Sequence, residues 1–131
     1  IMWNHCGVIR SGEGLEQALS ELMEVKKASK DVDVRPSAEG FSDLALALDL
    51  LGSIDSAEAT IRSAIARKES RGAHQRSDFK EMKSCETVNY VVELVDGRQT
   101  ISKTKVEDLP EVLRVAVKAY EQLSVDGRLL E

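Results

Sequence analysis

The stretch that decides the fold runs from residue 41 to residue 72 and reads FSDLALALDLLGSIDSAEATIRSAIARKESRG. Its apolar residues recur at steps of three and four, which places them on one face of a helix. They are Leu44, Ala47, Leu48, Leu51, Ile54, Ala57, Ile61, Ala64 and Ile65. We expect one long helix from Phe41 to Lys68 that stops by Gly72, because glycine adopts the left-handed conformation most easily. A break at Gly52 to Ser53 is the alternative, since a glycine inside a helix costs about 1 kcal/mol relative to alanine.

A second amphipathic helix is expected before this one, from about Gly14 to Lys30. Ser11 is a suitable N-cap, and lysines in the last turn suit the negative end of the helix dipole. The segment from Asp31 to Gly40 loses the helical period and contains a proline, so we expect a loop there. The apolar stripe of this helix comprises Leu15, Ala18, Leu19, Leu22 and Val25.

After residue 80 the pattern changes from helix to strand. Residues 87–95 are rich in β-branched side chains, and Asp96 and Gly97 form the dipeptide most typical of a tight hairpin turn. The two-residue turn predicts a hairpin over 87–106 with Val92 opposite Ile101. An isolated hairpin is only marginally stable, so this one must lean on the helices.

A terminal helix is expected over 108–123. Asp108 and Glu111 have the form of an N-terminal cap pair, and Pro110 suits the first turn because its missing N–H costs nothing there. The apolar stripe of this helix comprises Leu109, Val112, Leu113, Ala116, Tyr120 and Leu123.

These elements predict a mainly α fold: a helical bundle of about three to four helices with one long central helix, plus a small β-hairpin. We expect residues 1–131 to form a single domain, with a helical part at 1–80, the hairpin at 87–106 and the terminal helix at 108–123. A chain of 131 residues, 42% of them hydrophobic, is long enough to bury one core. Because it opens at Ile1 without an initiator methionine, we expect it to be a fragment of a larger protein.

The composition argues against several classes of protein. A net charge of -5 and few aromatic residues do not suit a nucleic-acid surface, and charges interrupt every apolar run before the roughly 20 residues of a membrane helix. Cys6 and Cys85 form no CxxC pair, which is typical of a reducing compartment, and we interpret both as small buried residues. His5 and His74 lack the spacing of metal ligands, and no glycine-rich phosphate loop is present. The sequence therefore predicts no catalytic, cofactor-binding or metal residue.

One basic run stands apart from the acidic background. From Arg62 to Arg76 the chain carries five basic residues and a single acid, Glu69. Cations near the end of a helix are favoured by its dipole, but this run continues beyond the expected stop at Gly72. The residues alone leave two interpretations open: a dedicated contact with carboxylates, carbonyls or another domain, or a solvated helix end.

Two stretches resemble a known family. Residues 67–79, RKESRGAHQRSDF, resemble the signature R-x-E-S-R-G-A-H-x-R-x-D-F in the C-terminal helical region of the flavoprotein subunit of succinate dehydrogenase and fumarate reductase. Residues 2–10, MWNHCGVIR, resemble a helix end of the same family, and the resemblance covers roughly residues 1–95. L-aspartate oxidase, of the same superfamily, more often reads E-S-R-G-x-H-Y and then D-Y-P, so the sequence leans towards the succinate and fumarate enzymes. It departs at Lys80, where the family usually has proline, and in the terminal helix, which the resemblance does not reach.

The resemblance implies a parent chain that interconverts succinate and fumarate through FAD. In such chains the dinucleotide fingerprint and the residues that hold flavin and substrate lie upstream, and none has a counterpart in this sequence. FAD therefore belongs to the parent enzyme and is not expected to be bound by this fragment, which should be inactive alone. The implied role is to pack against the flavin-binding domain of the same chain, through an apolar surface, and to support assembly with the iron–sulfur subunit.

The resemblance also implies which residues make that interdomain or subunit contact, and we call these six residues the polar joint. They are Arg67, Glu69, Arg71, His74, Arg76 and Asp78. The implied location is cytoplasmic and peripheral, at the inner face of the membrane, reached only indirectly through partner subunits. Two alternatives stay open: the C-terminal domain of L-aspartate oxidase, and a non-enzymatic helical adaptor that binds acidic partners through its arginine-rich turn.

Overall fold

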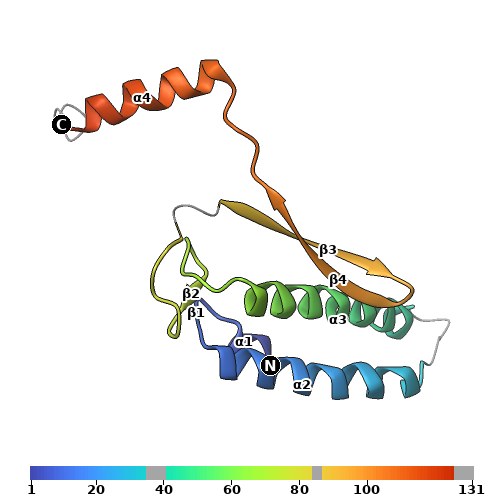
Figure 1. The fold of residues 1–131 in the computed structure, drawn as a ribbon. Coiled ribbons are helices and arrows are strands. Elements are labelled where there is room, and N and C mark those ends of the chain that lie inside the picture. The colour runs from blue at the N-terminus through green and yellow to red at the C-terminus, as the bar shows by residue number, and fades with distance from the viewer. Residues whose placement is uncertain (35–40, 84–86, 126–131) are drawn as a thin grey trace.

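The computed structural model describes residues 1–34, 41–83 and 87–125, with side chains up to residue 120. It is mainly helical with one antiparallel hairpin, which confirms the predicted fold class (Figure 1). In chain order the elements are α1 (Met2–His5), β1 (Ile9–Arg10), α2 (Gly12–Ala28), the 3₁₀ turn η1 (Ser29–Asp31), α3 (Ser42–Ala66), β2 (Gln75–Arg76), β3 (Val88–Val95), β4 (Arg98–Lys105) and α4 (Glu111–Val125).

Helices α2 and α3 run antiparallel, side by side, and enclose the core between them (Figure 1). The predicted stripes of both helices supply most of it, and Leu15 and Ile61 are fully buried. The buried apolar residues are Cys6, Leu15, Ala18, Leu22, Ile54, Ile61 and Ala64. Burial of Cys6 agrees with its interpretation as a small apolar residue, whereas Cys85 lies outside the described residues.

The start of α2 is as predicted. Ser11 has an extended backbone, and its hydroxyl accepts a hydrogen bond from the amide of Gly14 at 3.1 Å. The helix begins two residues earlier than expected, at Gly12, and its last turn passes into η1.

Helix α3 is continuous through Gly52, so the single-helix prediction is confirmed and the alternative break is wrong. Its end differs from the prediction. The helix stops at Ala66 because Arg67 already has an extended backbone, with φ -81° and ψ 96°. Gly72 has the left-handed conformation expected of it, with φ +56°, but it lies in a separate turn where Arg71 and His74 pair their backbones.

The first turns of α3 leave large apolar side chains uncovered. Leu46 is 66% exposed, Leu48 61% and Leu51 51%. With 25 residues against the 17 of α2, α3 is about 12 Å longer, so its first turns extend beyond the partner helix. Covering these side chains requires a surface outside the described residues.

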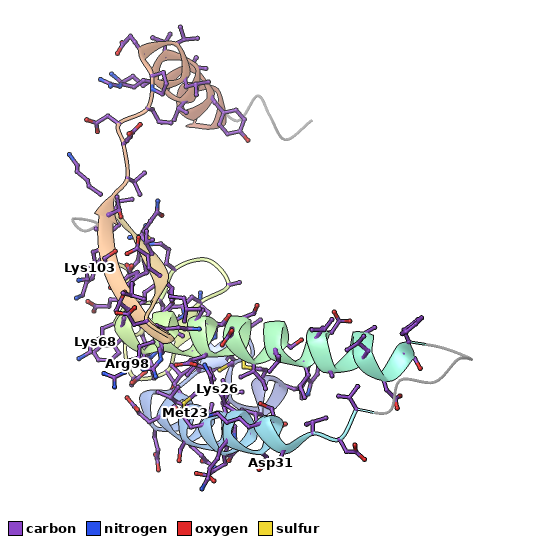
Figure 2. All side chains as sticks on the ribbon, turned by 90° about the vertical axis from the view of Figure 1, so that its right-hand side faces the viewer. Met23, Lys26, Asp31, Lys68, Arg98 and Lys103 are labelled. Atoms are coloured by element: carbon purple, nitrogen blue, oxygen red, sulfur yellow. The ribbon has the colours of Figure 1, made fainter. Side chains whose placement is uncertain are left out.

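An ionic cluster joins the last turn of α2 to the middle of α3. Glu58 of α3 is 4% exposed and accepts hydrogen bonds from Lys26 of α2 and from Arg62, both at 2.7 Å. Lys26 also donates to Asp55 at 3.0 Å, and Figure 2 shows it between α2 and α3. These hydrogen bonds lower the pKa of Glu58 against the opposing effect of burial, and raise that of Lys26. The buried carboxylate is thus fully paired.

The hairpin β3–β4 has the predicted register, with Val92 opposite Ile101. Its two turn residues, Asp96 and Gly97, have φ values of +50° and +72°, as a tight turn of this class requires. The hairpin packs on α3, where the Tyr90 hydroxyl donates to the carbonyl of Ala66 at 3.1 Å. A second contact comes from the amide of Gln99, which donates to the carbonyl of Asp55 at 2.8 Å.

Strands β1 and β2 form a short parallel pair that the sequence did not predict. Ile9 pairs with Gln75 and Arg10 with Arg76. The pair joins segments that are 66 residues apart in the chain, and it lies where α2 begins and α3 ends (Figure 1).

Helix α4 lies apart from the other helices, beyond the end of the hairpin (Figure 1). It begins at Glu111 rather than Asp108, because the carbonyl of Pro110 accepts the first helical hydrogen bond, from Arg114 at 3.0 Å. The predicted cap role of Asp108 is therefore wrong. Apolar residues of α4 are exposed, with Val112 at 80% and Tyr120 at 63%. In the part of the chain that the structure describes, no helix combines the length and apolarity that crossing a membrane demands.

Replacing Ile61 with alanine should lower the free energy of unfolding of the 131-residue chain by about 2–5 kcal/mol, because the side chain is fully buried and leaves a cavity. Leu48→Ala on the same helix is the control and should change it by less than about 0.5 kcal/mol. Urea unfolding followed by circular dichroism measures both. Equal losses in the two variants would contradict the position of the core.

Candidate functional site

The six residues of the polar joint come together at one end of the molecule, where α3 ends, α2 begins and β1 pairs with β2. Two of them are buried charges: Arg76 is 3% exposed and Glu69 is 4% exposed. Both buried charges are paired within the chain itself, Glu69 with Arg67 and Arg71 and Arg76 with Asp78. The expected contact with another domain or subunit stays a prediction.

Arg76 and Asp78 form the centre of the joint. The guanidinium donates from Nε to Asp78 Oδ1 and from Nη2 to Oδ2, both at 2.7 Å, and from Nη1 to the carbonyl of Ala64 at 2.8 Å. Asp78 Oδ2 in turn accepts from the first amide of α2, that of Gly12, at 3.0 Å. The cation thus lies at the negative end of α3 and the carboxylate at the positive end of α2, which stabilises both dipoles. The hydrogen bonds from Arg76 hold the pKa of Asp78 far below its usual range.

Glu69 is the second buried charge. Its carboxylate accepts from Arg67 Nη1 at 2.6 Å, from Arg71 Nη2 at 3.1 Å and from the backbone amide of Lys83 at 3.0 Å. Burial alone would raise its pKa, but the hydrogen bonds from Arg71, Lys83 and Arg67 outweigh it and lower the pKa to about 2. Glu69 therefore stays ionised and fixes the turn that follows α3.

Both ring nitrogens of His74 are used. Nε2 lies 3.1 Å from the carbonyl of Arg67, and Nδ1 lies 2.9 Å from Nη1 of Arg10. Because a carbonyl only accepts and a guanidinium only donates, the ring is neutral, with its proton on Nε2. Burial lowers its pKa, and the charges of Arg10, Arg76 and Arg67 lower it further.

Three further residues complete the joint, and the sequence reading missed them. Ser70 accepts from the amide of Arg76 at 2.8 Å and donates to the carbonyl of Phe79 at 2.8 Å, which closes the turn. Gly12 allows the close approach of Asp78, and Arg10 orients the ring of His74. Ser70 and Arg10 lie inside the two motifs quoted from the sequence, and those motifs were the signal that could have identified them. Nothing in the sequence indicated Gly12.

The arrangement suits a structural role better than a catalytic one. Both carboxylates are ion-paired, and the histidine has a partner on each nitrogen, so the joint presents no general base. Within residues 1–34, 41–83 and 87–125 no three carboxylate, histidine or cysteine side chains gather as metal ligands would. The other histidine, His5, lies 3.8 Å from Glu21 at the surface of α2.

Substituting Gly12 by alanine should destabilise the chain by about 1–3 kcal/mol. The added Cβ would lie 2.8 Å from Asp78 Oδ2 and 3.2 Å from Arg76 Nη2, so the carboxylate must move away from the Gly12 amide and from the buried guanidinium. Gly52→Ala in α3 is the matched control, because its Cβ meets nothing within 4 Å, and it should stabilise by about 0.5–1 kcal/mol. Thermal unfolding of both variants checks that Gly12→Ala lowers the stability and Gly52→Ala raises it. A shift in the same direction would contradict the geometry at Gly12.

Exchanging Glu69 for glutamine should change the acid sensitivity of the chain. Because the folded-state pKa of Glu69 is about 2, below its ordinary value of 4.5, the unfolded chain takes up the proton first as the pH falls. Its contribution to stability is therefore present above about pH 4.5 and is lost towards pH 2. Glu69→Gln should be less stable at pH 7 and lose less stability between pH 5 and pH 2. Glu24→Gln, at an exposed position of α2, should follow the wild-type curve in urea titrations at each pH.

Comparison with known proteins agrees with the resemblance of the two motifs. The family described as the C-terminal part of the fumarate reductase flavoprotein matches residues 1–120, so the match includes most of α4. The succinate dehydrogenase flavoprotein subunit of Rickettsia bellii is 36% identical over 96 residues, which are 72% of this chain and 16% of that protein. The fumarate reductase flavoprotein subunit of Haemophilus influenzae is 35% identical over 92 residues, 70% of this chain and 15% of that one.

A solved structure of a variant of E. coli quinol fumarate reductase superposes with a TM-score of 0.74 and 28% identity, over 83% of this chain and 20% of that one. The chain thus spans about a sixth of the length of the curated relatives it matches. It belongs to the family formed by the C-terminal domains of the succinate dehydrogenase and fumarate reductase flavoproteins.

Proposed function

We propose that the parent of this chain is the flavoprotein subunit of a succinate dehydrogenase or fumarate reductase, which interconverts succinate and fumarate through FAD. The observation that carries the proposal is the family match over residues 1–120, together with relatives named for these two activities. Within that parent, this domain packs against the flavin-binding domain and supports assembly with the iron–sulfur subunit. The catalytic groups are supplied by the rest of the parent chain.

The exposed apolar residues support a packing role. Trp3 is 93% exposed, Ile9 76% and Leu48 61%, and these values are high for large apolar side chains at the surface of a folded domain. Trp3 lies in α1 and Ile9 lies in β1, which follows α1 in the chain. Because β1 pairs with β2, the polar joint holds both of these segments in place. In this proposal the joint contributes to the interdomain contact by fixing the shape of the surface.

One observation supports leaving FAD to the rest of the parent chain. A helix N-terminus is the usual place for a dinucleotide pyrophosphate, but the N-terminus of α2 already receives the carboxylate of Asp78, which would repel an anion. We therefore assign no FAD contact to this chain and leave the flavin to the rest of the parent.

The proposed location is peripheral, at the inner face of the membrane, with contact made through partner subunits. The solved relative from E. coli is named as a quinol enzyme, and quinols are lipid-soluble. In such a complex, a chain of this family reaches the membrane through other subunits. The net charge of -5 agrees with this, because an anionic membrane surface attracts basic rather than acidic chains.

The first experiment captures the native parent with an antibody against residues 1–131 and records its mass, its flavin absorbance and its turnover of succinate and aspartate. We expect a chain several times heavier that carries FAD and oxidises succinate or reduces fumarate. Turnover of aspartate instead would assign the parent to L-aspartate oxidase. A flavin-free chain near 14.4 kDa would assign the free-standing adaptor.

A second experiment tests the role in assembly through Arg71, whose side chain donates to Glu69 and to the carbonyl of Lys83 at 2.9 Å. In the parent enzyme, Arg71→Ala should lower FAD content and weaken association with the iron–sulfur subunit, since a hydrogen bond to a charged group is worth about 1.5–3 kcal/mol. Lys68→Ala is the control, because Lys68 is exposed at the edge of the molecule (Figure 2). Flavin content, subunit association and activity that all stay at the wild-type level in Arg71→Ala would refute this role.

A further inference from the structure

Arg10 differs from the other arginines at its end of the molecule. Arg67 and Arg71 share Glu69, and Arg76 is paired with Asp78. Among the described residues, no carboxylate forms an ion pair with Arg10. Its guanidinium is instead oriented by neutral acceptors, since Nε donates to the carbonyl of Gly7 at 2.6 Å and Nη1 to the ring of His74 at 2.9 Å.

This orientation leaves part of the guanidinium available. A guanidinium carries five N–H donors, and these two contacts use only two of them. Arg10 is half-buried, so the remaining donors are partly removed from water. A cation in such a position is normally paired with an acid, because partial burial without compensation is costly.

A cavity of about 380 Å³ lies beside Arg10. Arg67 and His74 line it together with Arg10, and α3 adds the hydroxyl residues Thr60 and Ser63. The remaining wall is formed by alanines. The cavity is therefore a shallow, open space with Arg10, Arg67 and Ser63 at its boundary, since the Thr60 hydroxyl already donates to the carbonyl of Ser56 at 2.8 Å.

The surrounding charges make this space positive. Four arginines of this region, Arg10, Arg67, Arg71 and Arg76, are balanced by only two carboxylates, those of Glu69 and Asp78. The histidine between them is neutral, so it adds no negative charge. An excess of two positive charges in a chain of net charge -5 favours an anion here.

We propose that this cavity binds the carboxylate of an aspartate or glutamate side chain from the part of the parent chain outside residues 1–131. A planar guanidinium with two parallel N–H groups matches a carboxylate in geometry and in charge. The inference rests on the proposed function, because it requires a parent chain that continues beyond this domain. Since the chain spans about a sixth of its curated relatives, most of the parent lies elsewhere.

The neighbouring surface supports this occupant over a free anion. Val8 is 60% exposed and Ile9 is 76% exposed, directly before Arg10 in the chain. A charged anchor beside exposed apolar side chains is the usual composition of a protein contact, in which the apolar residues exclude water from the ion pair. A site for a free small anion has no need of such a border.

The test uses the FAD-loaded parent chain carrying Arg10→Lys. A water-soluble carbodiimide activates carboxylates, and the introduced amine then forms an amide with a carboxylate in direct contact, with the activating reagent leaving as its urea. Peptide mass spectrometry should find a link from position 10 to an aspartate or glutamate outside residues 1–131. The absence of a link, a link only to acids within 1–131, a link to a separate subunit, or coupling to added succinate would each overturn the proposal.

A second variant pair leaves Arg10 and its hydrogen bonds in place. Ser63→Asp puts a carboxylate into the cavity from α3 and should displace the incoming one, whereas Ser63→Asn has the same size and no charge. Ser63→Asp should increase hydrogen exchange at the amides of residues 7–10 in the parent by about tenfold, since the contact that ties this segment to the rest of the parent is lost. Equal exchange in the two variants would also overturn the proposal.

Failure of this inference is distinguishable from failure of the proposed function. The cross-link reports only what meets Arg10, while turnover of succinate or aspartate by the same preparation reports the activity. A parent that oxidises succinate but gives no cross-link keeps the function and loses the site.

Discussion

The arrangement of the core depends on the guanidinium of Arg76. It connects the last carbonyls of α3, through Ala64, to the first amide of α2, at Gly12, with Asp78 as the intermediate carboxylate. One ion pair thereby stabilises the dipoles of two antiparallel helices at the same end. Sliding α2 along α3 would break the hydrogen bond from the Gly12 amide to Asp78, whereas the buried Arg76 would keep its bonds to Asp78 and Ala64.

This constraint accounts for the irregular segment after α3. The chain has to return from the end of α3 and deliver Arg76 between the helix ends, and it does so through a turn that needs Gly72 in the left-handed conformation. Ser70 closes that turn and Glu69 neutralises the arginines beside it. The E-S-R-G-A-H run thus determines both the conformation of the turn and its charge balance. This explains why so many polar residues gather there although none is free to react.

The sequence predicted what periodicity and local turn chemistry determine. The stripes of α2 and α3 and the hairpin register follow from spacing alone. The end of α3 was misplaced because tertiary contacts decide it: the side chain of Arg67 donates to Glu69 and to the carbonyl of Val88 and lies 4.6 Å from the ring centre of Tyr90. The parallel pair β1–β2 was missed because two residues per strand leave no periodic signal. Likewise, the cavity beside Arg10 exists only once segments distant in sequence have met.

The distribution of polarity favours a part of a larger protein over a free-standing adaptor. An adaptor that binds acidic partners through its arginines would present them to solvent, yet Arg76 is 3% exposed and Arg67 and Arg71 are held by Glu69. Large apolar side chains are exposed instead, as at Trp3 and Leu48. Large apolar side chains gathered at a surface mark a site of contact with another surface. This distribution supports the proposal that the domain packs against the rest of a flavoprotein.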